Sequence, residues 1–573
     1  MCRLCDEKGK PQDHGTSLRR SRRDFLKASM ATAAAAAGSN LLTAPARADD
    51  SQGDDGPGDT GKPGQRYIIR GGAVMSMDPS VGDFPQGDVL VEGRKILAVG
   101  SNLQAGGAEV IDATGRIVMP GFIDTHHHQF ETVLRSFLAD GVLINDGSGS
   151  PSGTTTYFEF ILLKFAPVYR PQDVYINELF GGLSQLDAGV TTVHDVSQIH
   201  HSPQHSDAAI QALFDTGRRA AFGYFESAGA AILGTNPGNQ YPQDAFRIKK
   251  QWFSSTDQLV TMIMGGEVYL GDASTEQSWK IGRQLGLQIA AHILSPFGIR
   301  PIMDALAAGQ GGSNHDIGIG PDNLFIHMTG MSDFAWQKVR DVGAQVSIAF
   351  PIEMNMRHGM PPIVRMQSLG TPQHPFEPSL SVDVECTLTA DFFTQMRSCM
   401  NLQRMLVNQM ILDSPNGNQN LPNPLDWGLP QSAVTVPGFF PYWPNNNSPS
   451  PSYPAGVPAP LTTRDVLRYA TINGAKALGL DSKTGSLTPG KEADIIILDA
   501  TRINVMPLNQ VPGAVVSLMD RTNVETVIVA GKVRKWKGQL LDVDLDGLRQ
   551  QLEASRDFIF QKAGIPKNLF SSQ

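Results

Sequence analysis

Between about residues 119 and 480, short apolar runs alternate with helix-like stretches, and this alternation leaves few folds open to the chain. The stretches 207–216 and 333–341 have the pattern of helices between strands. Regular strand–helix alternation over this length predicts a parallel sheet, either open or closed into a barrel. The periodicity alone does not choose between the two. The strand-like runs include 190–193, 288–291, 324–326, 345–348 and 379–382.

A second type of pattern occurs on both sides of this region. Residues 66–118 contain short β-like runs separated by Gly-containing turns, and similar runs return within 486–540. We therefore expect one small β-sandwich domain built from both ends of the mature chain. The region between them spans 119–485, and residues 541–573 are predicted to form a helical tail.

Composition excludes several classes of protein. The chain has 573 residues, of which 41% are hydrophobic, enough for a large core and more than one domain. Its net charge is -9 and no basic stripe lies beyond the extreme N-terminus, so nucleic acid is not an expected partner. Four cysteines do not make a disulfide framework. The lone Cys2-x-x-Cys5 pair precedes an expected cleavage site and is assigned no role in the mature protein.

The N-terminus has the pattern of an export signal. Arg22-Arg23 precede an alanine-rich run that ends in the small-x-small site Ala46-Arg47-Ala48. The run is too short and too weakly apolar for a stable membrane span. Residues 1–48 resemble a twin-arginine signal peptide, which implies the twin-arginine export machinery as a partner and a periplasmic or secreted location. Residues 49–65 have the composition of a linker.

Residues 413–460 interrupt the strand–helix pattern with a segment rich in Asn, Pro and Ser. An insertion of this length without its own periodicity has a function or lacks regular structure. We interpret it as a barrel loop, either a lid with aromatic contacts or a surface excursion.

The strongest local motif is an apolar strand that ends in His126-His127-His128. Alternate side chains of a strand share a face, so His126 and His128 can point inward while His127 points away. Two neutral imidazoles at this spacing make half of a metal site. His292, His327 and Asp383 each follow another apolar run, at the end of a strand that, in a barrel, would carry the active site.

With these motifs the chain resembles the amidohydrolase superfamily, in the branch of triazine hydrolases and cytosine- or guanine-type deaminases. The resemblance covers about 66–540. It implies a (β/α)8 TIM-like barrel beside the small β-sandwich domain, and a homo-oligomer as in many relatives. The motifs that carry it are 120–128, 189–193, 470–475 and 485–494.

The resemblance also implies roles for the strand-end residues. His126 and His128, together with His292 and Asp383, correspond to ligands of one divalent metal ion. Zinc fits this donor set best, and iron or manganese would also fit. His327 corresponds to a residue that contacts substrate or the attacking water. A divalent ion lowers the pKa of bound water to about 7; Asp383 would then accept a proton and pass it to the leaving group.

Two-metal chemistry through a carboxylated lysine is not supported, because no lysine ends the expected fourth strand at 259–267. Glu267 at that end either brings a second carboxylate to the site or is a polar loop residue. His200, His201 and His205 form another histidine-rich loop, which either binds a second ion or lines the mouth of the pocket.

One position departs from the family pattern. Deaminases of this branch usually carry a glutamate three residues after the fifth-strand histidine, where this chain has Ser295. A serine hydroxyl cannot replace that glutamate as an acid near neutral pH. We therefore expect hydrolysis of a carbon–nitrogen bond in a small molecule, an amide or cyclic amide. The alternative is deamination or dechlorination of a heteroaromatic ring.

The segment 351–362 resembles the substrate-facing loop of the family, and Asn355 and His358 are candidates for substrate contact. A plain structural role for this loop is the competing interpretation. A reading from a different class is a catalytically silent barrel that binds a small molecule. The intact set of strand-end histidines and Asp383 argues against silence, and Ser295 is the feature that favours it.

Overall fold

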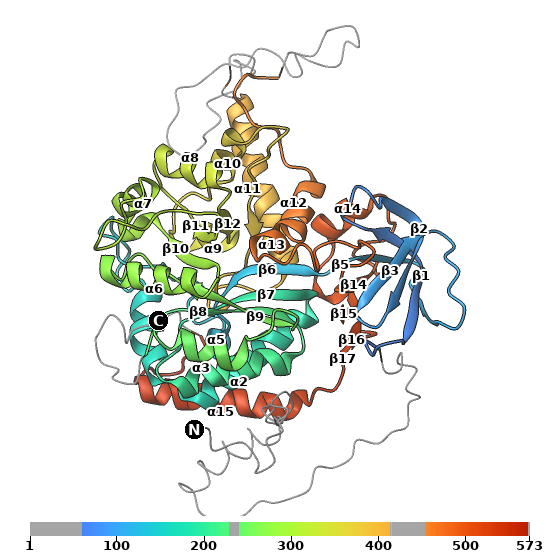
Figure 1. The fold of residues 1–573 in the computed structure, drawn as a ribbon, viewed down its shortest axis with the longest axis horizontal. Coiled ribbons are helices and arrows are strands. Elements are labelled where there is room, and N and C mark those ends of the chain that lie inside the picture. The colour runs from blue at the N-terminus through green and yellow to red at the C-terminus, as the bar shows by residue number, and fades with distance from the viewer. Residues whose placement is uncertain (1–59, 228–239, 413, 415–452, 571–573) are drawn as a thin grey trace, which may run out of the picture. The chain divides into compact units, whose positions relative to one another are not determined.

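The structure is a computed structural model that describes residues 60–227, 240–412, 414 and 453–570 (Figure 1). The expected signal peptide at 1–48 lies outside the described residues, as do most of the linker at 49–65 and most of the insertion at 413–460. None of the helices within the described ranges is both long and apolar enough to cross a membrane.

The central region is a barrel of eight parallel strands in sequential order. The bridge between His127 and Asp383 joins the last strand to the first. Two backbone hydrogen bonds reinforce this closure: His128 N–H donates to Asp383 O at 2.8 Å, and Asp383 N–H donates to His126 O at 2.9 Å. The (β/α)8 prediction is confirmed. The strands are β6 (Phe122–His127), β7 (Val190–Ser197), β8 (Arg219–Tyr224), β9 (Val260–Gly265), β10 (Ile289–Ile293), β11 (Asn323–His327), β12 (Gln345–Ile348) and β13 (Ser379–Leu380).

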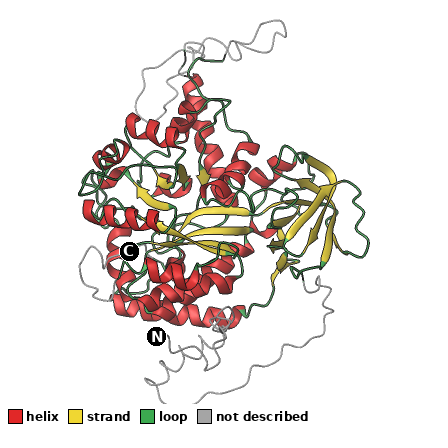
Figure 2. Cartoon of the chain, viewed as in Figure 1, coloured by secondary structure: helices red, strands yellow, loops and turns green. Residues whose placement is uncertain are grey.

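Helices follow the strands and cover the barrel (Figure 2). Local sequence sets their ends: α8 begins after Ser332, whose side chain accepts a hydrogen bond from Ala335 N–H, and ends at Gly343 with φ 75°. The main helices are α2 (Pro171–Asp187), α3 (Pro203–Thr216), α5 (Ala245–Trp252), α6 (Asp272–Gln284), α7 (Arg300–Ala307), α8 (Asp333–Val342), α9 (Phe350–Asn355), α10 (Ile363–Leu369), α11 (Phe392–Leu412), α12 (Thr463–Tyr469), α13 (Ile472–Ala477) and α15 (Leu545–Ala563).

The motif at 470–475 packs against the strands of the barrel. Ala475 and Ala477 of α13 belong to the same buried cluster as Ile123, Ala290 and Leu324 from the strands. Glycine is required at position 474, because a Cβ there would lie 2.8 Å from the Cβ of Ile123. The motif therefore serves packing of the barrel.

The two ends of the chain form one small β domain, as expected, but the arrangement differs from a two-sheet sandwich. Its strands make one nine-stranded sheet that is joined in the middle by the antiparallel pair β5–β14. Both arms of the sheet contribute side chains to a single core, so the surfaces that enclose this core belong to one sheet. The strands are β1 (Arg66–Met75), β2 (Asp83–Glu92), β3 (Lys95–Gly100), β4 (Glu109–Asp112), β5 (Arg116–Pro120), β14 (Ile495–Asp499), β15 (Val524–Val529), β16 (Lys532–Trp536) and β17 (Gln539–Leu540).

The junction between this sheet and the barrel explains two further motifs. β5 passes into β6 through Gly121, where a Cβ would lie 2.2 Å from the side chain of Thr191. The buried Arg219 on β8 forms ion pairs with Glu492 at 2.6 Å and with Asp494 at 2.8 Å. The motif at 485–494 thus supplies the carboxylates that hold the barrel to the β domain.

The predicted C-terminal helical tail contains α15, which lies along α2 (Figure 1). Phe560 of α15 packs on Phe165, with ring centroids 4.9 Å apart, and on Phe137 at 5.7 Å. Phe165 ends the π-helix η2 (Phe158–Phe165), which follows the first barrel strand. The tail therefore supports a segment close to the strand ends.

Candidate metal centre and substrate pocket

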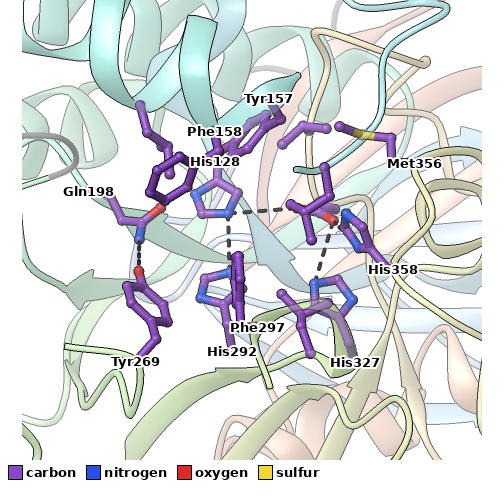
Figure 3. Close-up of a pocket in the computed structure, with 15 residues that line it drawn as sticks. His128, Tyr157, Phe158, Gln198, Tyr269, His292, Phe297, His327, Met356 and His358 are labelled. Carbon is purple, nitrogen blue, oxygen red and sulfur yellow. Dashed lines mark hydrogen bonds and ion pairs between the residues drawn. The ribbon is translucent and has the colours of Figure 1, made fainter. Parts of the chain in front are cut away.

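Four side chains from three parts of the barrel meet at the carboxyl ends of the strands. His126 Nε2 lies 3.0 Å from Asp383 Oδ1, and His128 Nε2 lies 3.6 Å from the same oxygen. His292 Nε2 lies 3.3 Å from His128 Nε2. All four residues are buried, and the three histidines offer nitrogens within 4.8 Å of one another. Figure 3 shows His128 beside His292. The structure thus brings together the four residues that the sequence predicts as ligands.

Hydrogen bonds at the far side of two of these rings determine what their Nε2 atoms can do. His128 Nδ1 donates to Val196 O at 3.0 Å, and His292 Nδ1 donates to Glu267 Oε1 at 2.5 Å. Each neutral imidazole then has a lone pair at Nε2, and the two lone pairs face each other. Facing lone pairs need a positive charge between them. Three imidazoles and a carboxylate are a donor set that zinc and similar divalent ions bind.

The pKa shifts of two of the three histidines agree with this fit. Burial, and then the neighbouring histidines, lower the pKa of His126 well below its ordinary value, which keeps the ring neutral. Burial likewise lowers the pKa of His128. For His292 burial acts in the same direction and is the largest influence, but the carboxylates of Glu267, Asp383 and Glu226 together outweigh it and raise the pKa. Glu267 therefore makes His292 a more basic ligand and fixes its orientation.

This contact decides between the two interpretations of Glu267. Its second oxygen, Oε2, accepts from the backbone N–H of His292 at 3.0 Å. Both carboxylate oxygens are thus directed at His292. Glu267 therefore positions a candidate ligand and does not itself point into the site as a second carboxylate.

His327 differs from His292 although a glutamate lies behind it too. Glu353 Oε1 lies 2.8 Å from His327 Nδ1 and accepts from Ala349 N–H at 3.1 Å. Burial raises the pKa of Glu353 well above its ordinary range and lowers that of His327 to about 4, so both groups are neutral at pH 7. We assign Glu353 as the donor of its O–H to Nδ1, because the reverse arrangement would put that proton on the buried, unpartnered Oε2; the imidazole proton is then on Nε2. That N–H faces Asp383 Oδ2 at 3.6 Å.

A second grouping of metal-binding type contains His126, His327 and Asp383. The proton on His327 Nε2 distinguishes this histidine from the ligands, because an N–H cannot coordinate a cation. His327 is therefore a hydrogen-bond donor at the edge of the site, in line with the role that the resemblance implies for it.

Backbone conformation places two of these residues. His327 has φ 70° and Asp383 has φ 72°, in the left-handed region that residues other than glycine rarely adopt. Each residue ends a barrel strand, and the conformation turns its side chain toward the neighbouring strand ends. Conformational strain of this kind concentrates at functional sites.

The two residues proposed for substrate contact have different positions. His358 lines the cavity, and its Nδ1 lies 3.9 Å from Asp383 Oδ2. Burial lowers its pKa to about 3, so it is neutral. Asn355 is exposed and its amide lies 3.5 Å from Ala139 O. The structure does not bring Asn355 to the cavity, because the last turn of α9 directs it outward and directs Met356 inward.

The histidine-rich loop after β7 does not form a second metal site among the residues that the structure describes. Its three side chains bind different partners. His200 Nδ1 lies 3.0 Å from Ser206 Oγ, His201 Nε2 donates to Ala166 O, and His205 Nε2 donates to Tyr169 O. These contacts fix the loop to its neighbours.

A cavity of about 460 Å³, partly open to solvent, lies over the metal-binding residues. Asp383 is the one carboxylate among its described lining residues, which include no lysine or arginine. Ser295 is also absent from that lining: its backbone N–H donates to Thr329 Oγ1. The walls are largely apolar, formed by Leu143, Tyr157, Phe158, Leu162, Leu294, Phe297, Met356 and Val384.

Two polar lining residues escaped the sequence analysis, Gln198 and Tyr269. Gln198 is the first residue after β7, and Tyr269 follows β9 by four residues. Their positions just beyond strand ends could have singled them out, but glutamine and tyrosine are common in loops and carry no ligand signal.

Comparison with known proteins finds a matching family model and similar deaminases. Residues 451–534 match the family model described as Amidohydrolase family. The chain is 25% identical over 506 residues to the 5'-deoxyadenosine deaminase of Methanosarcina acetivorans, covering 87% of this chain and 99% of that protein. It is 24% identical to the 5-methylthioadenosine/S-adenosylhomocysteine deaminase of Symbiobacterium thermophilum, covering 82% and 93%.

Solved structures share the fold. An adenosine deaminase from Xanthomonas campestris with bound zinc superposes with a TM-score of 0.63 at 18% identity, covering 87% of this chain and 99% of that one. The atrazine chlorohydrolase from Arthrobacter aurescens, complexed with zinc, gives 0.62 at 18% identity, covering 86% and 100%.

Proposed function

We propose that this chain, an amidohydrolase-family enzyme that hydrolyses carbon–nitrogen bonds other than peptide bonds, acts on an amide or cyclic amide bond of a neutral small molecule. The observation that carries the proposal is the lining of the cavity. Asp383 is its one carboxylate within the described ranges, and the place of the usual second acid is taken by Ser295, which lies outside the lining.

We propose zinc as the ion held by His126, His128, His292 and Asp383. Zinc in the two structural neighbours supports this choice. A bound divalent ion supplies a water of lowered pKa and polarises an oxygen of the substrate. Iron or manganese in place of zinc would change the metal and leave the residue roles as they are.

The proton transfers fall to Asp383. Its Oδ2 has no hydrogen-bond partner among the described residues, although it is buried. It faces His327 Nε2 at 3.6 Å and His358 Nδ1 at 3.9 Å, so it is held at the centre of the site. Asp383 takes a proton from the attacking water and returns it to the leaving nitrogen.

His327 stabilises the negative charge that develops on the carbonyl oxygen. Its Nε2–H is fixed by the contact between Nδ1 and Glu353, so the donor is in place before the reaction begins. A preorganised donor in a buried site contributes most where charge appears in the transition state.

Amide hydrolysis needs one proton relay, because the nitrogen that receives the proton is also the leaving group. Deamination of a heteroaromatic ring needs in addition an acid for the ring nitrogen. The described lining offers Asp383 for the first task and no second carboxylate for the other.

Deamination of a heteroaromatic amine is the second candidate, and the names of the relatives favour it. They are deaminases of adenosine derivatives, and this chain covers more than nine-tenths of each. Removal of chloride from a ring, as in the chlorohydrolase, is a variant of the same chemistry.

The test is a substrate panel on zinc-loaded protein, with neutral anilides and lactams beside adenosine derivatives and chlorotriazines. We expect turnover of amides, loss of it in Asp383→Asn, and normal rates in the control Asp391→Asn, which contacts Thr389 and Thr394 and is not among the described lining residues. Ammonia release from the ring amines without amide turnover would replace the proposal by deamination. Zinc binding without turnover of any member would favour the catalytically silent reading.

We also propose that residues 1–48 direct export by the twin-arginine route to the periplasm or beyond. The Arg22-Arg23 pair and the Ala46-Arg47-Ala48 site support this. Arg22→Lys with Arg23→Lys should keep the protein in the cytoplasm, whereas the unchanged chain should yield a periplasmic product that begins near Asp49. A cytoplasmic product that retains residues 1–48 would contradict the proposal.

A further inference from the structure

Gln198 and Tyr269 form a polar side of the cavity for which the proposed reaction gives no role. They lie on the opposite side of His128 and His292 from His358 and Met356 (Figure 3). The rest of the wall on their side is apolar, so they are the described groups that can recognise a polar atom of the substrate there.

A buried carboxylate behind the wall holds both side chains. Glu226 follows β8 and is 2% exposed. Its Oε1 accepts from Gln198 Nε2 at 2.8 Å and from the hydroxyl of Tyr269. Gln198 Nε2 also donates to the Tyr269 oxygen at 3.1 Å. Tyr269 packs its ring on Phe297 with centroids 5.4 Å apart.

Hydrogen-bond counting fixes the orientation of the Gln198 carboxamide. The Tyr269 hydroxyl has one hydrogen, which goes to Glu226, so its oxygen can only accept from Gln198. The nitrogen of Gln198 then uses both of its hydrogens, one toward Glu226 and one toward Tyr269. A proton on the other oxygen of Glu226 would also leave Oε1 an acceptor, so the orientation holds whenever Oε1 itself carries no proton.

The carbonyl oxygen of Gln198 remains available. It has no hydrogen-bond partner in the described part of the chain, and unlike Glu226 Oε2 it is not completely shielded from solvent. Because Gln198 lines the cavity, this oxygen is an acceptor presented to whatever the cavity holds.

We infer that Gln198 is a specificity-determining residue that accepts a hydrogen bond from an N–H group of the substrate, with Glu226 and Tyr269 as positioning residues. The substrate is then a neutral molecule with an N–H donor on the side away from His358, such as a secondary amide or a lactam. The inference deepens the proposed function and rests on it for the class of substrate.

The test uses ligand pairs that differ by one methyl group on nitrogen: acetanilide with N-methylacetanilide, and 2-piperidone with N-methyl-2-piperidone. Rapid-mixing tryptophan fluorescence on the zinc-loaded protein measures the affinity of each before turnover consumes it. We expect the wild type to bind the N–H member about tenfold or more tightly, since a blocked donor leaves a buried acceptor unsatisfied. Gln198→Met keeps the size and removes the acceptor, so the ratio should fall to about threefold or less. The control Gln211→Met, at a half-buried position of α3 outside the described lining of the cavity, should keep the wild-type ratio.

The positioning residues have their own variants. Tyr269→Phe keeps the ring on Phe297 and frees one side of the Gln198 amide, so the ratio should fall while the melting temperature stays close to that of the wild type. Glu226→Gln can place an N–H donor where the carboxylate oxygen accepted. The Gln198 carboxamide can then flip, so the affinity ratio should fall as well. A purely structural role for either residue would leave the ratio unchanged.

Equal affinities for both members in the wild type, binding of neither member, or a ratio that Gln198→Met leaves intact would each overturn the inference. Failure of the proposed reaction has a different signature. The wild type would then prefer the N–H ligands in the binding measurement but would hydrolyse no amide of the panel.

Discussion

Replacing Glu267 and Glu353 by glutamine, one at a time, compares two histidines whose Nδ1 atoms have the same type of partner. Each glutamate contacts the Nδ1 atom of a strand-end histidine, His292 or His327. The contacts imply opposite roles: His292 offers a lone pair to the metal ion, whereas His327 offers an N–H to the substrate. The same substitution should therefore affect metal binding at one position and catalysis at the other.

Glu267→Gln should weaken zinc binding. The two carboxylate oxygens accept from Nδ1–H and from the backbone N–H of His292, and a carboxamide has one oxygen for these two donors. One charge-assisted hydrogen bond is lost, which corresponds to about 1.5–3 kcal/mol. Zinc affinity should fall about 10- to 100-fold, in the range usual for partners of metal ligands.

Glu353→Gln should leave zinc affinity within about threefold and lower kcat. At Oε1 a neutral carboxyl both donates to His327 Nδ1 and accepts from Ala349 N–H, which a carboxamide cannot do at one atom. A carbonyl oxygen there moves the imidazole proton to Nδ1 and removes the donor at Nε2. Loss of such a donor lowers kcat about 100- to 1,000-fold.

Chelator competition measures the zinc affinity of each variant, and steady-state kinetics on an amide of the panel measures kcat. Circular dichroism confirms that both variants are folded. Unchanged zinc affinity in Glu267→Gln would refute the role of Glu267. An equal loss of zinc in Glu353→Gln would show that His327 is a ligand.

Three further predictions concern stability. Arg219→Ala strands the buried carboxylates of Glu492 and Asp494 without their cation, so the free energy of unfolding in urea should fall by about 3–5 kcal/mol; a loss below about 1 kcal/mol would show that the junction does not depend on this pair. Phe560→Ala should lower the free energy of unfolding by about 3–5 kcal/mol in the same assay, because it removes the packing against Phe165. It should also raise KM, because η2 lines the cavity; an unchanged KM would show that the tail does not affect the cavity. Burial lowers the pKa of His200 to about 3, so its unfolded form binds a proton first as pH falls below about 6.5. The stability of the wild type relative to His200→Asn should therefore decline between about pH 6.5 and 3, and a constant difference would contradict the burial argument.

The sequence predicts which residues meet at the candidate metal site, and the reason is geometric. His126, His128, His292 and Asp383 all stand at the ends of apolar runs, and the carboxyl ends of barrel strands share one face. Any chain with these runs in a closed barrel must bring the four together. The resemblance to the superfamily supplied the closure that periodicity alone left open.

Other features depend on geometry that a linear pattern does not contain. Asn355 and Met356 are neighbours in sequence, but the phase of one short helix sends the first outward and the second into the cavity. The partnership of Glu353 with His327 joins residues that are 26 positions apart. The roles of Gln198 and Tyr269 depend on Glu226, which belongs to a third strand end. The β domain was expected as a sandwich because alternation reports buried faces and does not report whether two faces belong to one sheet.

The closure of the barrel has a consequence for handling the protein. The two hydrogen bonds that join the last strand to the first involve the backbones of His126, His128 and Asp383. An ion held by the side chains of these residues would thus stabilise the contact between the last and the first strand, and its removal would weaken that contact. Amide protons of His128 and Asp383 should then exchange slowly in zinc-loaded protein and much faster after chelation, so that deuterium uptake at two backbone positions would report occupancy without any substrate in hand.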